Sequence, residues 1–102
     1  MENRTIQDTI DAIVDWGSSR GILENSTASK QFLKTIEEVG ELSIALQKDD
    51  IEQVKDAVGD VAVTLILLAE LKGLHFADCV SHAYDVISKR KGKMQNGVFV
   101  KD

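Results

Sequence analysis

Residues 37–41 read Glu-Glu-Val-Gly-Glu, and a second acidic cluster at residues 56–60 reads Asp-Ala-Val-Gly-Asp. The second cluster runs directly into residues 61–69, Val-Ala-Val-Thr-Leu-Ile-Leu-Leu-Ala, one of the most apolar stretches of the chain. A carboxylate beside such a stretch is costly to desolvate unless something compensates its charge. Carboxylate oxygens suit a hard divalent cation, Mg²⁺ or Mn²⁺. The two clusters therefore indicate a metal site, and with it chemistry on phosphates.

The composition is that of one small globular domain, expected to span residues 1–102. Apolar residues make up 43% and charged residues 28%, and there is no proline to interrupt long helices. No apolar run approaches the roughly 20 residues that a membrane span requires. Residues 1–10 lack an apolar signal region, and the single Cys79 has no intrachain partner for a disulfide. We expect a cytoplasmic protein with no membrane partner.

Charge is distributed unevenly along the chain. Residues 1–88 hold 16 acidic and 7 basic residues, whereas residues 89–102, called here the basic arm, hold five basic residues and one acidic residue. An acidic body argues against a nucleic-acid partner, which would require a broad basic face. The basic arm is suited to hold a small anion.

Four helices are expected, over about residues 5–18, 26–48, 50–72 and 75–91. Asp50 and Gln53 have the spacing of a capping pair for the third helix. In the tail, Asn96-Gly97 is a strong turn signal before Val98-Phe99-Val100, which favours a short extended arm. The pattern predicts an all-α fold, a small bundle resembling a four-helix bundle.

The helix over residues 50–72 is apolar around its full circumference between Val61 and Leu71. A helix of this kind must be buried on all sides, and three other helices in a short chain scarcely suffice to cover it. We expect a second subunit to complete the core, in a homodimer or a dimer-of-dimers tetramer.

The acids of residues 37–41 have a plain alternative reading, the solvated side of an amphipathic helix. Asp60 does not fit that reading, because it shares a stripe with Thr64 and Leu67. Asp56 lies one turn earlier on the same side. If the two long helices are antiparallel, Glu38 and Glu41 face Asp56 and Asp60, and converging carboxylates from facing helices are how bundle cores bind metals.

Two motifs carry a resemblance to a known family. Lys34-x-x-Glu37-Glu38-x-x-Glu41-Leu42, followed by Gly59-Asp60-Val61, resembles the MazG-like all-α nucleoside triphosphate pyrophosphohydrolases, whose signature is E-E-x-x-E, a spacer and E-x-x-D. The tail over residues 91–99 is similar to that of short single-domain members, including phage-borne ones. The resemblance covers about residues 16–101.

The resemblance implies an activity and a set of roles. The reaction would be hydrolysis between the α- and β-phosphates of a nucleoside triphosphate, dependent on Mg²⁺ with Mn²⁺ as a possible substitute. Glu38, Glu41 and Asp60 would be metal ligands. Glu37 would be a further ligand or the group that orients the attacking water, and whether Glu37 or Glu38 acts as the general base stays open.

One position departs from the family pattern. The E-x-x-D motif would place a glutamate at position 57, where this chain has Ala57, and Asp56 is the nearest acid. A shift of one residue turns a helical side chain by about 100°. Whether Asp56 replaces the missing ligand is therefore open.

Several residues outside the acidic clusters are candidates for substrate contacts. Lys34 would touch a phosphate or pair with Glu38 one turn away. Trp16 would stack on a base or belong to the core. Cys79 is expected to be a small core residue. The substrate contacts predicted in the basic arm are Lys91, Lys93 and Asn96.

Two other functions remain open on the sequence. One is a phosphoribosyl-ATP pyrophosphohydrolase, which has a similar helical core. The other is a non-catalytic helical module that binds a nucleotide or a partner protein, a reading to which Ala57 lends weight.

Overall fold

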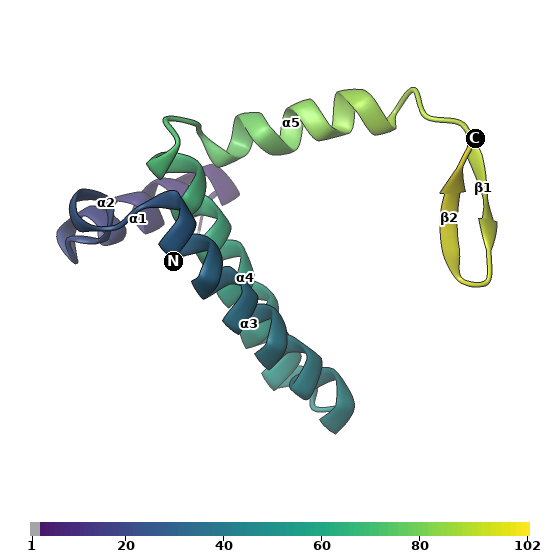
Figure 1. Cartoon of the computed structure of the whole chain (residues 1–102), viewed down its shortest axis with the longest axis horizontal. Coiled ribbons are helices and arrows are strands. Elements are labelled where there is room, and N and C mark those ends of the chain that lie inside the picture. The colour runs from purple at the N-terminus through teal and green to yellow at the C-terminus, as the bar shows by residue number, and fades with distance from the viewer. Residues whose placement is uncertain (1–2) are drawn as a thin grey trace.

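The computed structural model describes residues 3–102; Met1 and Glu2 of the predicted domain lie outside them. The described residues form five helices and one β-hairpin (Figure 1). The elements are α1 (Ile6–Ser19), α2 (Ile22–Asn25), α3 (Ala28–Lys48), α4 (Ile51–Leu71), α5 (Phe76–Ile87), β1 (Gly92–Gln95) and β2 (Val98–Lys101). The predicted all-α fold is confirmed. No helix among these residues combines the length and apolarity that crossing a bilayer demands.

The antiparallel pair of α3 and α4 forms the centre of the molecule (Figure 1). Thr27 caps α3 by accepting a hydrogen bond from the Lys30 backbone N–H at 3.2 Å. Asp49 ends α3 in the left-handed region at φ 53°, and the Asp50 side chain caps α4. The predicted capping pair of Asp50 and Gln53 is confirmed, because Gln53 Nε2 donates to Asp50 Oδ2 at 3.2 Å. This short connection holds the two helices side by side.

The seam between α3 and α4 is partly polar. The Thr35 hydroxyl donates to Thr64 Oγ1 at 2.9 Å, and Thr64 Oγ1 donates to the Val61 carbonyl at 2.7 Å. Gln31 Nε2 donates to the Thr64 carbonyl at 3.3 Å. These polar side chains are buried and satisfied by one another, so the network fixes how the two helices align.

Helix α1 covers the side of α4 that carries Ile66 and Leu67. Its N-terminus has a complete capping box between Thr5 and Asp8. Gly17 lies inside the helix rather than ending it. It faces the buried Leu67 side chain, which a Cβ at this position would contact too closely. The short α2 follows Gly21 at φ 80°. The sequence did not predict α2, since one turn is too short to show a helical period.

The C-terminal part projects away from this body (Figure 1). The predicted fourth helix is shorter than expected, since α5 ends at Ile87, and the extended tail is confirmed as a hairpin. Asn96 and Gly97 form its turn with φ of 52° and 82°, and Gln95 pairs with Val98.

The prediction that Cys79 is a core residue is wrong. Cys79 is exposed, and so are Val80 and Ile87 of the apolar stripe that was expected to be buried. The stripe exists, but among the described residues only the first turn of α5 lies against the body, so its outer turns face solvent.

Candidate active site

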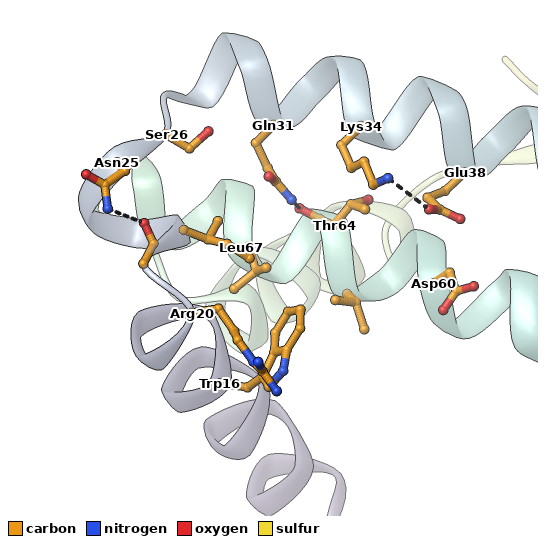
Figure 2. A pocket seen from close by; sticks show the side chains of 13 residues that line it. Trp16, Arg20, Asn25, Ser26, Gln31, Lys34, Glu38, Asp60, Thr64 and Leu67 are labelled. Atoms are coloured by element: carbon orange, nitrogen blue, oxygen red, sulfur yellow. Dashed lines mark hydrogen bonds and ion pairs between the residues drawn. The ribbon is translucent and has the colours of Figure 1, made fainter.

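The predicted acids meet along the edge of the α3–α4 seam, where Glu38 on α3 lies across from Asp60 on α4 (Figure 2). Glu38 is the most enclosed of them, with a side chain only 12% exposed. Its Oε2 atom is buried and has no hydrogen-bond partner among the described residues. Lys34 Nζ lies 3.0 Å from Glu37 Oε2 and 3.8 Å from Glu38 Oε1, so the expected ion pair with Glu38 is present alongside a shorter one with Glu37.

The electrostatics of Glu38 show a deficit of positive charge. Burial raises the pKa of its carboxyl above the ordinary value, and Glu41 and Asp60 raise it further; only Lys34 acts in the opposite sense. An enclosed carboxylate oxygen without a partner, beside two more carboxylates, fits a divalent cation by the chemistry of its donors. The residues present are therefore suited to hold the ion that the sequence predicted.

A second group of acids opens onto a small hollow, called here the Asp56 hollow, of about 190 Å³. It is lined by Glu41, Ala45, Gln53, Asp56, Ala57 and Asp60. Ala57 is buried in the seam whereas Asp56 is exposed, yet both border the same hollow. Asp56 thus lies beside the place where the family pattern would put a glutamate.

Within residues 3–102, no three side chains of Asp, Glu, His or Cys already converge closely enough to hold a metal ion. The structure brings Glu38, Glu41, Asp56 and Asp60 to one region of the seam without fixing their roles as ligands.

Beside the acids lies a larger cavity of about 520 Å³, called here the Trp16 pocket (Figure 2). It is lined by Trp16, Arg20, Gly21, Ile22, Asn25, Ser26, Gln31, Lys34, Glu38, Asp60, Val63, Thr64 and Leu67. Trp16 is 45% exposed and forms part of the wall, so it is not a core residue. Asp60 borders both this pocket and the Asp56 hollow.

Sequence reasoning did not predict five polar residues of this pocket, Arg20, Asn25, Ser26, Gln31 and Thr64. Arg20 and Asn25 lie in the Gly-containing connection and the short α2, where no periodic pattern marked them. Gln31 could have been found, since it lies two turns before Glu38 on the same side of α3.

The basic arm is not part of either cavity within one chain. The Trp16 pocket and the Asp56 hollow are lined by residues 16–67 alone. Lys93 and Asn96 lie in the hairpin, and Lys91 directly precedes it. The hairpin lies beyond the far end of α5, well away from the α3–α4 seam (Figure 1).

An all-α body with a pocket beside acids on two facing helices defines a class, the helical proteins with a carboxylate site between antiparallel helices. The model of the MazG nucleotide pyrophosphohydrolase domain matches residues 26–95, which is more than half of the chain. The chain therefore belongs to the MazG nucleotide pyrophosphohydrolase domain family. The matched range contains every predicted site residue except Trp16 and Asn96.

One similar protein comes from Haemophilus phage HP1 (strain HP1c1), where it is described as an uncharacterized 18.2 kDa protein in the rep-hol intergenic region. It is 38% identical to this chain over 65 residues, which cover 64% of this chain and 40% of the phage protein. The match thus spans well under two thirds of that relative's length. No solved structure matches the chain significantly.

Proposed function

We propose that this protein is a Mg²⁺-dependent nucleoside triphosphate pyrophosphohydrolase. It would cleave (d)NTPs between the α- and β-phosphates and release a nucleoside monophosphate and pyrophosphate. The observation that carries this proposal is the position of Asp60, which borders both the Trp16 pocket and the Asp56 hollow. A nucleotide has a flat, largely apolar base at one end and a polyanionic phosphate chain at the other. A pocket for the base directly beside acids that bind a cation for the phosphates suits such a substrate.

In this proposal Glu38, Glu41, Asp56 and Asp60 hold Mg²⁺, with Mn²⁺ as a possible substitute. When bound, the cation supplies the positive charge that the phosphates demand. Asp56 takes the place of the acid that the family pattern has at position 57, because both positions border one hollow.

Two residues at the rim complete the phosphate end of the site. Glu37 is exposed at the rim and is held there by Lys34, whose Nζ lies 3.0 Å from Glu37 Oε2. Its carboxylate would orient the attacking water and accept its proton. Lys34 lines the Trp16 pocket, and its pKa is raised chiefly by the hydrogen bond to Glu37, so it stays protonated and available to a phosphate oxygen.

The nucleoside end enters the Trp16 pocket. The Trp16 ring offers a face for stacking, and the side chains of Asn25 and Gln31 offer amide groups at the lining. Gln31 already donates to the Thr64 carbonyl, so its position is fixed before a substrate arrives.

A product assay tests the function. Each NTP, each dNTP and phosphoribosyl-ATP is incubated with Mg²⁺, and the products are separated by ion-exchange chromatography. Monophosphate with pyrophosphate from (d)NTPs is the expected result, with activity lost on chelation and restored by added Mg²⁺. Release of orthophosphate would refute the proposed bond of attack. Turnover confined to phosphoribosyl-ATP would favour a phosphoribosyl-ATP pyrophosphohydrolase, and binding without turnover would favour a non-catalytic module.

A further inference from the structure

Arg20 contributes a positive charge to the wall of the Trp16 pocket. Two basic side chains line this pocket, Arg20 and Lys34. Lys34 is paired with two glutamates of α3, whereas Arg20 takes part in no ion pair with any residue that the structure describes. The guanidinium group carries five N–H donors, and no carboxylate of the described chain engages them. Arg20 is therefore available to a ligand in the pocket.

The position of Arg20 decides which part of a ligand it meets. It lies at the end of α1, and its backbone N–H donates to the Trp16 carbonyl at 2.9 Å, so the two side chains come from successive turns. Figure 2 shows both side chains on the side of the pocket away from Glu38 and Asp60. Since phosphates belong beside the acids, Arg20 is placed to meet the base that stacks on Trp16.

The guanidinium group of Arg20 discriminates between bases by its chemistry. It offers donors in a planar fork and has no acceptor. Guanine presents two adjacent acceptors, O6 and N7, which match two donors of this fork. Adenine and cytosine instead present an amino group, which is a donor, and uracil and thymine present a single carbonyl. A stacked base whose edge meets Arg20 is thus bound best when it is guanine.

The two amide side chains of the pocket, which would favour adenine, are already engaged. Amides read adenine through a paired contact that uses both their nitrogen and their oxygen. Gln31 Nε2 donates to the Thr64 carbonyl at 3.3 Å. Asn25 Nδ2 donates to the Gly21 carbonyl at 2.8 Å. A paired contact with adenine would compete with these bonds, whereas a contact from Arg20 breaks no ion pair of the chain.

We propose that Arg20 reads the base of the bound nucleotide and gives the Trp16 pocket a preference for purines with a keto group, guanine above all. This role rests on the proposed function for the entry of the nucleoside into the pocket, and it narrows that function to a class of base. Arg20 is a specificity-determining residue and takes no part in the chemistry at the phosphates.

The fluorescence of Trp16 tests the preference directly, because this is the single tryptophan of the chain. Nucleoside monophosphates are the probes, since they lack the bond that hydrolysis would break. GMP and IMP are expected to quench the fluorescence with a Kd about 10-fold or more below that of AMP, CMP and UMP, as a bidentate arginine contact allows. Equal affinities for IMP and AMP would overturn the proposal, and so would a lack of quenching by every monophosphate.

Substitution of Arg20 assigns the preference to this side chain. Arg20→Gln is expected to bring the Kd values of GMP and AMP together, with helical circular dichroism unchanged, because the residue is exposed and has ordinary right-handed backbone angles. Arg20→Lys keeps the charge but not the fork and should also lose most of the preference. Arg4→Gln, the same change at an exposed arginine outside the pocket, is the matched control and should keep it.

One result with these variants would point to a different role. If Arg20→Gln weakens the binding of every monophosphate equally and Arg20→Lys restores it, Arg20 binds a phosphate and the proposed reading of the base is overturned.

Hydrolysis separates the role of Arg20 from the proposed function. In Arg20→Gln, the ratio of kcat/KM for GTP to that for ATP is expected to fall about 10-fold. If both triphosphates are cleaved between the α- and β-phosphates and this ratio does not change, the role of Arg20 is refuted and the function stands. If no triphosphate is cleaved although GMP binds in preference through Arg20, the function is refuted and the role of Arg20 stands.

Discussion

The α3–α4 pair and the region formed by α5 and the basic arm are built from similar amphipathic patterns but reach different degrees of burial. In the pair, Thr35 and Thr64 are nearly inaccessible and hydrogen-bonded across the seam, and Leu67 is buried where α1 covers α4. In α5, the apolar stripe is just as regular, yet Val80 and Ile87 stay about half exposed. The difference teaches that periodicity predicts which face of a helix is apolar, whereas burial depends on whether a partner is supplied by the same chain.

The largest expected effect tests whether the acids of the α3–α4 pair are required for hydrolysis. Asp60→Asn and Glu38→Gln should each lower kcat/KM for a triphosphate by at least about 1,000-fold, because a held divalent cation contributes several kcal/mol to such reactions. The melting temperature should stay or rise, since each change removes repulsion between carboxylates. Glu52→Gln, on α4 but outside both cavities, is the control for rate. Near-normal turnover in either site variant would remove that residue from the site.

The second prediction compares the loss of stability when an apolar side chain is truncated in each region. Ile66→Ala removes a buried side chain that faces α1 and should lower the free energy of unfolding by about 2 to 5 kcal/mol. Ile87→Ala truncates a half-exposed side chain of α5 and should cost less than about 0.5 kcal/mol. Both are measured by urea denaturation. Equal costs would mean that α5 is packed against its own chain in solution.

A smaller effect probes the polar seam. Thr35→Val keeps the shape of the side chain but removes the hydrogen bond to Thr64, and it should lower the free energy of unfolding by about 1 kcal/mol. The comparison is Ser43→Ala, which removes an exposed hydroxyl from the same helix. If the two variants have the same stability in denaturant titrations, the buried network does not contribute to the alignment of α3 and α4.

The smallest effect concerns the junction between the two regions. His75 Nδ1 lies 3.0 Å from Glu70 Oε2, and this hydrogen bond is the main cause of the raised pKa of His75, with charge from Glu70, Asp78 and Asp11 adding to it. Asp15 lines the same cavity as these groups. Glu70→Gln should lower the pKa of His75, followed by the NMR shift of its ring proton through a pH titration.

The sign of the associated stability change follows from the raised pKa. The protonated imidazole is favoured in the folded state, so its contribution is complete below the unfolded pKa of about 6.5 and is lost as the pH rises through the folded pKa. The difference in stability between the wild type and His75→Gln should therefore shrink with rising pH. A difference that grows with pH would contradict the assigned pair.

The sequence allowed the fold class, the long helices and the hairpin turn to be predicted, because caps and periodicity are local. The cap formed by Asp50 and Gln53 involves residues that are close together in the sequence, and so does the turn formed by Asn96 and Gly97. The proximity of Glu38 and Asp60 was also predictable, from the antiparallel direction that a short connection imposes. Cys79 was mispredicted for the opposite reason: its burial depends on which element covers α5, and that information is not local.

The Trp16 pocket was only partly predictable. Trp16 and Lys34 were candidates because of their residue types, whereas Arg20 and Asn25 belong to a connection with no periodic pattern. Their position follows from the crossing of α1 over α4, which depends on contacts between residues distant in sequence.

That crossing has a consequence for the evolution of substrate range. Gly17 lets α1 approach Leu67 closely, and Leu67 and Trp16 line the same pocket. The residue at position 17 therefore acts as a spacer between the two walls of the cavity. A methyl group added there would meet the end of the Leu67 side chain, which would have to move and so reshape that wall of the pocket. A substitution at a residue outside the lining would thereby change the shape of the cavity.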